Sequence, residues 1–234
     1  MLSIQAITFD LDDTLWDIGA VIAEAEKNIY QWLSVHCPKS TERYSLTDMQ
    51  QVRMEAVDEF PEFSHDLGEL RRLAFKKVLS TTGYDESWVN RAFERFMVMR
   101  NNVELYPDAL PVLDTLAQAY PLASLTNGNA DLEQIGLNHH FSVTISAKDH
   151  GVAKPHQDIF LAACRALQCD PREVLHIGDS PEHDVLGAAN AGLRTVWLNR
   201  RGETWRHSEK ADFEAADLNE VLEFLKTTIN RNRI

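Results

Sequence analysis

The chain has 234 residues, and its 23 Lys and Arg against 36 Asp and Glu give a formal net charge of −13. With 44% hydrophobic and 25% charged residues, the composition is that of a globular protein of one or two domains. So acidic a chain lacks the surplus of Lys and Arg that binds a phosphate backbone, and we expect no nucleic-acid partner. A small anionic substrate remains compatible, because a local site can be positive within an acidic protein.

No apolar run approaches the roughly 18 to 20 residues that span a bilayer, so we expect no membrane partner. The N-terminus starts with a strand-like run at 4–9 and lacks the basic region and cleavage site of a signal peptide. Three cysteines, Cys37, Cys164 and Cys169, without a C-x-x-C pair disfavour disulfides and a zinc site. These features predict a cytoplasmic protein with reduced thiols.

The first predicted element is a strand at 4–10 that ends in acidic residues. Helices without strands follow it, because apolar residues recur at spacings of three and four, as in Leu70, Leu73, Ala74 and Val78. The predicted helices of this block are 20–35, 47–59, 67–79 and 86–99. The pattern predicts an all-helical domain at 18–100, inserted after the first strand.

Strands and helices alternate beyond that block. The predicted strands are 122–126, 141–145, 174–178, 195–198 and 213–216, and the predicted helices are 155–167, 181–191 and 218–225. Ser180 and Pro181 suit the cap and first turn of the second of these helices, and Gly192 ends it. Such alternation predicts an α/β fold, in which a Rossmann-like parallel sheet flanked by helices is built from 1–17 and 101–234.

The first strand runs into the loop Asp10-Leu11-Asp12-Asp13-Thr14. Ligands of an open parallel sheet bind beyond the carboxyl ends of its strands, and an extended backbone points Asp10 and Asp12 the same way. Two carboxylates on one small loop repel each other unless a cation compensates. Mg²⁺ prefers oxygen ligands, so the loop predicts a magnesium site, with a solvated turn that caps a helix as the structural alternative.

The later strand ends also carry residues suited to phosphate or metal. Thr126 and Asn127 offer a hydroxyl and turn N–H groups that can cradle an anion. Lys154 precedes a helix start, where a cation does not stabilise the helix, so we expect it to face a shared anion. Asp179 follows a strand, and Asp184 lies one turn into the next helix. Each residue alone also fits a plain turn, a solvated lysine or a helix cap, but together they favour a phosphate and metal site.

Four motifs carry a resemblance to a known family. They are Asp10-x-Asp12-x-Thr14, Thr126, Lys154 and Gly178-Asp179-x-x-x-x-Asp184. In this order they resemble the motifs of the haloacid dehalogenase-like hydrolase superfamily over essentially the whole chain, and the domain at 18–100 resembles its helical cap. The runs ITFDLDDTL, PLASLTNGN and VLHIGDSPEHDVLGAA are similar to small-metabolite phosphatases, including bacterial enzymes that act on FMN and on 5-amino-6-(5-phospho-D-ribitylamino)uracil.

The resemblance implies a Mg²⁺-dependent phosphatase with an aspartyl-phosphate intermediate. It implies Asp10 as the nucleophile and Asp12 as the general acid and base, which also reaches the metal through its backbone carbonyl. Asp179 would be the remaining carboxylate on the Mg²⁺, which Asp10 also touches, while Asp184 would hold a metal-bound water.

The phosphoryl group would be held by three residues of the later motifs. They are Thr126, Asn127 and Lys154. The substrate would be a small phosphorylated metabolite whose leaving group the cap covers. Candidates for lining it are Trp16, Phe60, Phe63, His65 and Arg71. Phe60 and Phe63 fit a cap core equally well, and Arg71 fits a solvated helix face.

Other functions share parts of this pattern. The family's dehalogenases use the same nucleophile without a metal and lack an acid at the position of Asp12. A sugar phosphomutase shares motifs and cap but keeps the phosphate in its product. A phospho-switch receiver uses Asp, Thr, Lys and Mg²⁺, but its phosphoacceptor follows a later strand, and a binding module would not need the nucleophile. Monomer and homodimer are both compatible with the sequence.

Overall fold

A computed structural model describes residues 4–231 of the chain. They form two compact units, one of 4–17, 104–128 and 136–231 and the other of 18–103 and 129–135. The sequence analysis placed the boundaries of the helical domain at 18 and 100. The compact units differ from that prediction because 101–103 and 129–135 group with the helices.

The first unit is built on a sheet of six strands in the order β3-β2-β1-β4-β5-β6, and every neighbouring pair is parallel. The strands are β1 (Ala6–Phe9), β2 (Leu122–Thr126), β3 (Val143–Ser146), β4 (Val174–Gly178), β5 (Arg194–Leu198) and β6 (Phe213–Ala215). All six were predicted, and β2 and β4 match at both ends. The predicted α/β fold with a parallel sheet is therefore confirmed.

Every residue of β1, β2 and β4 is buried. These strands lie inside the sheet, where both faces are covered, and their sequences are mostly apolar, with a few buried polar residues such as Thr8 and His176. The edge strands β3 and β6 are only partly buried, which explains why their sequence signals are weaker.

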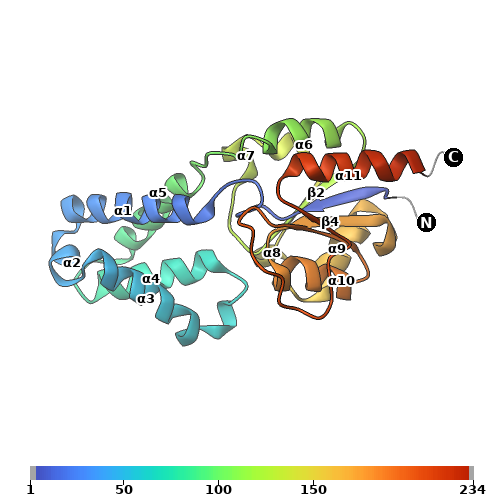
Figure 1. The fold of residues 1–234 in the computed structure, drawn as a ribbon. Helices are drawn as coiled ribbons and strands as arrows, with labels where there is room; N and C mark the ends of the chain where they lie inside the picture. The colour runs from blue at the N-terminus through green and yellow to red at the C-terminus, as the bar shows by residue number, and fades with distance from the viewer. Residues whose placement is uncertain (1–3, 232–234) are drawn as a thin grey trace. The chain divides into compact units, whose positions relative to one another are not determined.

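Helices cover both faces of this sheet. Helices α6 (Ala109–Ala117) and α11 (Leu218–Arg231) lie on one face, and α9 (Gln157–Leu167) and α10 (Gly187–Asn190) lie on the other (Figure 1). The short α8 (Ala147–His150) and two 3₁₀ turns, Asn138–His140 and Pro171–Glu173, complete the connections. Helix α6 was not predicted, because Pro107 and Pro111 suggest a loop. The structure places Pro111 in the first turn of the helix, where proline is tolerated.

The helix predicted from Pro181 to Gly192 forms in two parts. Its first part, Pro181–Leu186, is a wide π-type turn in which the N–H of Val185 donates to the carbonyl of Ser180 at 3.2 Å, and α10 follows. Ser180 caps it as predicted, since its side chain accepts from the N–H of His183. Wide turns of this kind occur often at functional sites, and this one contains Asp184.

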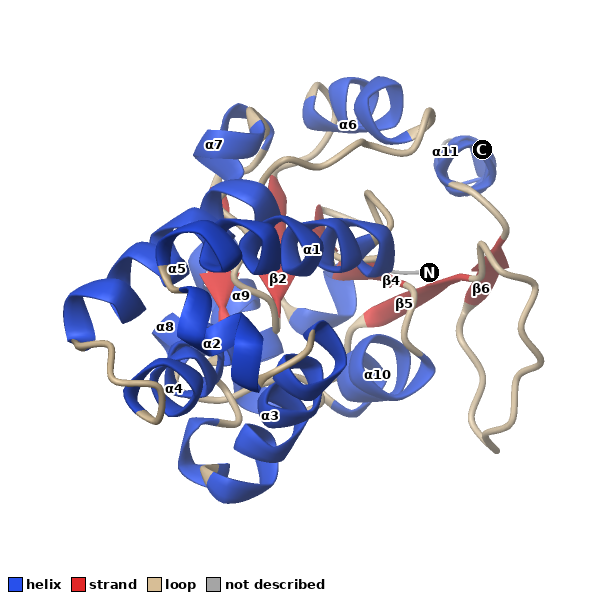
Figure 2. Cartoon of the chain, turned by 90° about the vertical axis from the view of Figure 1, so that its left-hand side faces the viewer, coloured by secondary structure: helices blue, strands red, loops and turns tan. Residues whose placement is uncertain are grey.

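The second unit is helical, as predicted (Figure 2). Its elements are α1 (Ile18–His36), α2 (Pro38–Arg43), α3 (Leu46–Glu59), α4 (Leu67–Ser80), α5 (Glu86–Arg100) and α7 (Leu132–Ile135), with a 3₁₀ turn at Pro61–Phe63. Helix α1 packs on α5, and α4 packs on both α3 and α5. The four predicted helices match within two residues at each end, whereas the short α2 and α7 were not predicted. Ile29, Leu33, Phe75 and Phe96 lie in the core of this unit.

The three cysteines are free thiols, and Cys37 and Cys164 are buried. Over residues 4–231, the helices are too short or too polar to cross a lipid bilayer.

Candidate active site

The candidate site lies in the first unit, at the carboxyl ends of the central strands. The chain passes from β1 to β2 on one side and later returns to β4 on the other, so the strand order reverses at β1. Open α/β sheets bind ligands at such a switch point. Asp10 follows β1, Thr126 ends β2, and Asp179 follows β4. The sheet thus brings three predicted site residues to adjacent strand ends.

A buried lysine lies at the centre of the site. The Nζ atom of Lys154 donates to Oδ1 of Asp10 at 2.6 Å and to Oδ1 of Asp184 at 2.5 Å. Burial alone would lower the pKa of Lys154, but the charges of both aspartates outweigh this and raise the pKa above its ordinary value. These contacts favour the charged ammonium, and its role of facing a phosphoryl oxygen stays a prediction.

Asp10, Asp179 and Asp184 together present carboxylate oxygens within 4.8 Å of one another. Burial raises the pKa of Asp10 well above its ordinary value, the charge of Lys154 opposes this, and the other two carboxylates add to the rise. Burial and the charges of Asp184 and Asp13 raise the pKa of Asp179 to about 7. One ammonium does not compensate three carboxylates, so this donor set fits a hard divalent cation such as Mg²⁺.

The carboxylate of Asp184 behaves differently. Burial would raise the pKa of Asp184, but the charge of Lys154 and the hydrogen bond from His176 lower it below its ordinary range. Its Oδ1 atom lies 3.1 Å from Nε2 of His176, and its Oδ2 atom accepts the N–H of Ser180 at 2.9 Å. A Cβ atom on Gly178 would lie 2.3 Å from Cγ of Asp184, so only glycine leaves room for this carboxylate.

The loop after β1 turns through Asp13, whose φ of 62° is in the left-handed region. The hydroxyl of Thr14 donates to Oδ2 of Asp10 at 3.2 Å and to Oδ1 of Asp179 at 3.4 Å. Asp12 is half-buried, and its Oδ1 atom accepts the indole N–H of Trp16 at 2.9 Å. Asp12 is not one of the three clustered carboxylates. Its contact with a metal through the backbone carbonyl stays a prediction.

Asn127, which directly follows β2, holds the backbone of Lys154 in place. The side chain of Asn127 accepts the N–H of Lys154 at 2.8 Å and donates to the carbonyl of Lys154 at 3.0 Å. The predicted role of Asn127 was to offer its backbone N–H to the phosphoryl group. In the structure, its side-chain amide fixes the backbone of Lys154. Thr126 is buried, and its hydroxyl accepts the N–H of Gly128 at 2.9 Å, which shapes the turn.

The sequence analysis missed two arginines near the site. Arg200 donates to the carbonyl of Thr14 and to the carboxylate of Asp108, with its guanidinium 4.1 Å from the centre of the Tyr106 ring. Arg201 pairs with Asp13 at 3.0 Å. Both lie in a polar segment that showed no sequence signal, because their contacts depend on how the loop after β5 folds back. A cavity of about 230 Å³ opens beside them. It is lined by Asp13, Asp179, Ser180, Trp197, Arg201 and Glu203, among others.

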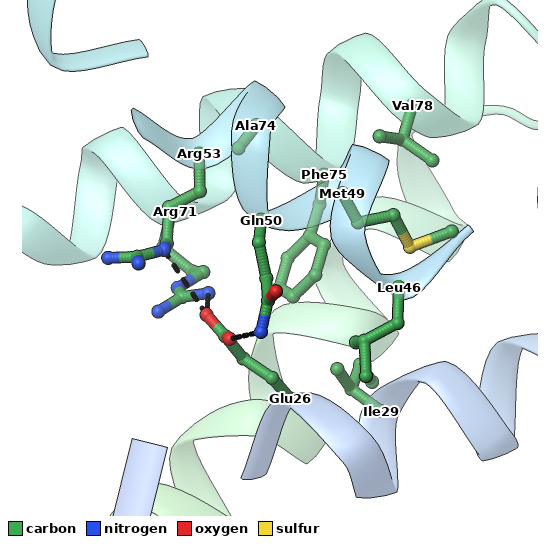
Figure 3. A pocket seen from close by; sticks show the side chains of 10 residues that line it. All are labelled: Glu26, Ile29, Leu46, Met49, Gln50, Arg53, Arg71, Ala74, Phe75 and Val78. Carbon is green, nitrogen blue, oxygen red and sulfur yellow. Dashed lines mark hydrogen bonds and ion pairs between the residues drawn. The ribbon is translucent and has the colours of Figure 1, made fainter. Parts of the chain in front are cut away.

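Two predicted substrate-lining residues have other partners. Trp16 is fully buried, and its N–H is bound to Asp12. Arg71 is also buried and pairs with Glu26 at 2.7 Å inside the helical unit (Figure 3). The alternative of a solvated helix face is therefore wrong for Arg71. Phe60 packs on the core of the helical unit, which is the structural alternative considered for it. Phe63 and His65 are half-buried in the segment between α3 and α4.

Comparison with known proteins agrees with these motifs. A family model described as haloacid dehalogenase-like hydrolase matches residues 4–192. The 5-amino-6-(5-phospho-D-ribitylamino)uracil phosphatase YigB of Escherichia coli (strain K12) is 30% identical over 210 residues, which are 86% of this chain and 88% of that protein. A glyceraldehyde 3-phosphate phosphatase of Methanopyrus kandleri is 28% identical over 239 residues, which are 95% of this chain and 97% of that one.

A solved structure also matches over nearly the whole chain. The 2-haloacid dehalogenase from Pseudomonas syringae pv. Tomato DC3000 superposes with a TM-score of 0.89 at 35% identity, and the match covers 96% of this chain and 99% of that one. Family match, curated relative and fold agree with the four motifs around Asp10 and Lys154. The chain belongs to the haloacid dehalogenase-like hydrolase family.

Proposed function

We propose that this protein is a Mg²⁺-dependent phosphatase that hydrolyses a small phosphorylated metabolite through an aspartyl phosphate on Asp10. The observation that carries the proposal is the cluster of three carboxylates around one buried lysine at the switch point of the sheet. A site for displacing halide needs no metal, whereas a phosphoryl group with its negative oxygens needs compensating positive charge. Mg²⁺, when bound by Asp10 and Asp179, would supply part of that charge.

The first step is attack on phosphorus by Asp10. Lys154 holds one oxygen of its carboxylate and Thr14 donates to the other, so the nucleophile is oriented before substrate arrives. The ammonium of Lys154, the hydroxyl of Thr126 and the N–H of Asn127 would face the phosphoryl oxygens. An oxygen of Asp10 bonds to phosphorus as the bond to the leaving oxygen breaks, which leaves an aspartyl phosphate.

Asp12 would handle the protons in both steps. It stands apart from the carboxylate cluster and is held by the indole of Trp16, so its environment differs from that of Asp10. It gives a proton to the departing alkoxide, which leaves as an alcohol. It then takes a proton from the water that attacks the phosphorus, which releases inorganic phosphate and restores the carboxylate of Asp10.

For the substrate, we propose FMN or a phosphorylated ribitylaminouracil as the first compounds to test. The runs that include Asp10 and Asp179 are similar to phosphatases for these metabolites, and a curated relative carries the second substrate in its name. We further propose a cytoplasmic location, with neither a nucleic-acid nor a membrane partner. The acidic composition supports the first of these exclusions.

The direct test is a panel of phosphorylated metabolites with Mg²⁺, scored by released phosphate and ranked by kcat/KM. We expect turnover that disappears with a chelator and returns with added Mg²⁺. Full turnover without metal would contradict the proposal.

The similarity to a 2-haloacid dehalogenase supports a second candidate, so the panel includes 2-haloacids with halide release as the readout. Halide release that exceeds phosphate release would favour the dehalogenase. An absolute need for a sugar bisphosphate, with phosphate kept in the product, would favour a phosphomutase.

A further inference from the structure

We propose that His176 is a positioning residue that acts through Asp184 to set the affinity of the site for Mg²⁺. The proposal rests on the function proposed above, because it assumes that the cluster binds a metal. His176 lies in the run VLHIGDSPEHDVLGAA but is not one of its motif residues Gly178, Asp179 and Asp184, and the structure shows it hydrogen-bonded to Thr8 and Asp184.

The pairing of two strands fixes the ring of His176. Thr8 in β1 is its partner across the parallel pair with β4, so the two side chains lie next to each other, and both are buried. The Oγ1 atom of Thr8 lies 2.8 Å from Nδ1 of His176. The ring of His176 also packs edge-to-face against the ring of Phe160 in α9, with ring centres 5.1 Å apart and planes at 88°. The imidazole is therefore held on two sides.

The alternation of side chains along β4 also brings the carboxylate of Asp184 next to His176. His176 and Gly178 lie two residues apart and face the same side of the sheet. The missing side chain of Gly178 leaves the space that the carboxylate of Asp184 fills. From there, Oδ1 of Asp184 reaches Nε2 of His176 at 3.1 Å. A larger residue at 178 would separate the two groups.

The network also assigns the proton on the ring. Asp184 lies against the ammonium of Lys154, so its carboxylate is ionised and acts as an acceptor. Nε2 of His176 then carries the hydrogen that it donates to Oδ1 of Asp184. Thr8 lies at the other ring nitrogen, so hydrogen bonds link Thr8 through His176 to Asp184.

The hydrogen bonds to Asp184 determine which of its two carboxylate oxygens is available to a metal. Lys154 and His176 occupy both lone-pair directions of Oδ1 of Asp184. Oδ2 accepts the N–H of Ser180, and a carboxylate oxygen has a second acceptor direction, which is available for a metal or a metal-bound water. His176 thus sets the rotation of the carboxylate. Partners that hold metal ligands in this way typically change metal affinity by about 10- to 100-fold when they are removed.

The experiment measures the dissociation constant of Mg²⁺ by isothermal titration calorimetry, with MgCl₂ added to metal-free protein. His176→Leu removes the donor, and we expect binding about 10- to 100-fold weaker. His176→Gln places an amide donor near the position of Nε2 and should restore most of the affinity. Thr8→Val removes the hydrogen-bond partner of Nδ1 that helps to hold the ring and should weaken binding, but less than His176→Leu.

The chain offers a matched control in His140, a second buried histidine of the same unit. Its side chain is 3% exposed, and its Nε2 atom lies 2.7 Å from Asp114, away from the site. His140→Leu should leave the Mg²⁺ dissociation constant unchanged. At saturating Mg²⁺, His176→Leu should also recover a kcat near that of the wild type, because its defect is in metal binding.

Any one of four results would overturn the proposal. His176→Leu that binds Mg²⁺ as tightly as His140→Leu would show that the histidine only fills space. His176→Gln that binds as weakly as His176→Leu would show that the donor does not matter. If His176→Leu does not fold, Thr8→Val with wild-type affinity for Mg²⁺ overturns it instead. A wild-type protein that binds no Mg²⁺ would overturn the proposed function as well, which separates the two failures.

Discussion

At the scale of single residues, the ammonium of Lys154 contacts two carboxylates whose pKa values are shifted in opposite directions. Lys154 pairs with both Asp10 and Asp184, yet the pKa of Asp10 is raised while that of Asp184 is lowered. The difference arises because Asp184 also accepts from His176 and Ser180, whereas Asp10 lies between two other carboxylates. The site therefore combines one carboxyl group whose pKa is lowered with two whose pKa values are raised, and a bound cation would favour the ionised form of those two.

The first prediction concerns the nucleophile. Asp10→Asn should abolish turnover, because an amide does not attack phosphorus. The protein should still fold with equal or greater stability, since the change removes a buried negative charge from a cluster of three. Phosphate release and thermal unfolding in metal-free buffer provide the measurements. Rates near those of the wild type would remove Asp10 from this role.

The second prediction concerns the proton donor. Asp12→Asn should slow the hydrolysis of alkyl phosphates most, because their alkoxide leaving groups need a proton. An activated aryl phosphate, whose leaving group departs as a stable anion, should lose less. The ratio of the two kcat/KM values, compared between wild type and variant, is the readout. Equal losses with both substrates would leave the general-acid role of Asp12 without support.

At the scale of elements, the helical unit is held by a buried ion pair. Glu26 in α1 accepts from Arg71 in α4 and from Gln50 in α3, and Arg53 lies 3.2 Å away (Figure 3). The guanidinium of Arg71 also lies 4.2 Å from the centre of the Phe96 ring in α5. Four helices therefore meet at one charge pair, which ties the unit together.

The third prediction follows from this pair. Arg71→Ala should lower the free energy of unfolding by about 3–5 kcal/mol, because it leaves the carboxylate of Glu26 buried with less compensation. Arg72 is the matched control, since it pairs with Glu69 and Glu86 at the surface with its side chain 29% exposed. Arg72→Ala should cost at most about 1 kcal/mol. Urea denaturation measures both, and equal losses would contradict the buried role of Arg71.

The fourth prediction is a pH dependence of the same pair. Burial would raise the pKa of Glu26, but the hydrogen bond and charge of Arg71 hold it below its ordinary value. An acid whose pKa is lower in the folded state adds stability above its unfolded pKa of about 4.3 and loses it as the pH falls further. The stability difference between wild type and Glu26→Gln should therefore be largest at neutral pH and shrink below about pH 4. A difference that does not change with pH would refute this.

The elements also show what sequence patterns can and cannot predict. Buried strands such as β2 and amphipathic helices such as α4 follow from local sequence patterns. Their predicted bounds were close to those in the structure. Helix α6 was missed because two prolines masked a helix that tertiary packing stabilises. The wide turn at Pro181–Leu186 was missed because a π-type turn has no distinct spacing of apolar residues.

At the scale of the whole molecule, the alternation of strands and helices and the inserted helical domain follow from the order of patterns along the chain. Asp10, Lys154, Asp179 and Asp184 were found from their motifs, and the sheet brings them together. His176 was not found, because its role depends on which residue of β1 lies beside it. Such contacts join residues 168 positions apart, and no local pattern contains them.

The central claim is that Asp10 carries the phosphoryl group during turnover. The most direct measurement is rapid acid quenching during the reaction with Mg²⁺, followed by mass spectrometry of the peptide that contains Asp10. The account predicts one added phosphoryl group on Asp10, absent in chelator and absent in Asp10→Asn. Rapid phosphate release with no phosphorylated peptide, or phosphorylation at another residue, would contradict it.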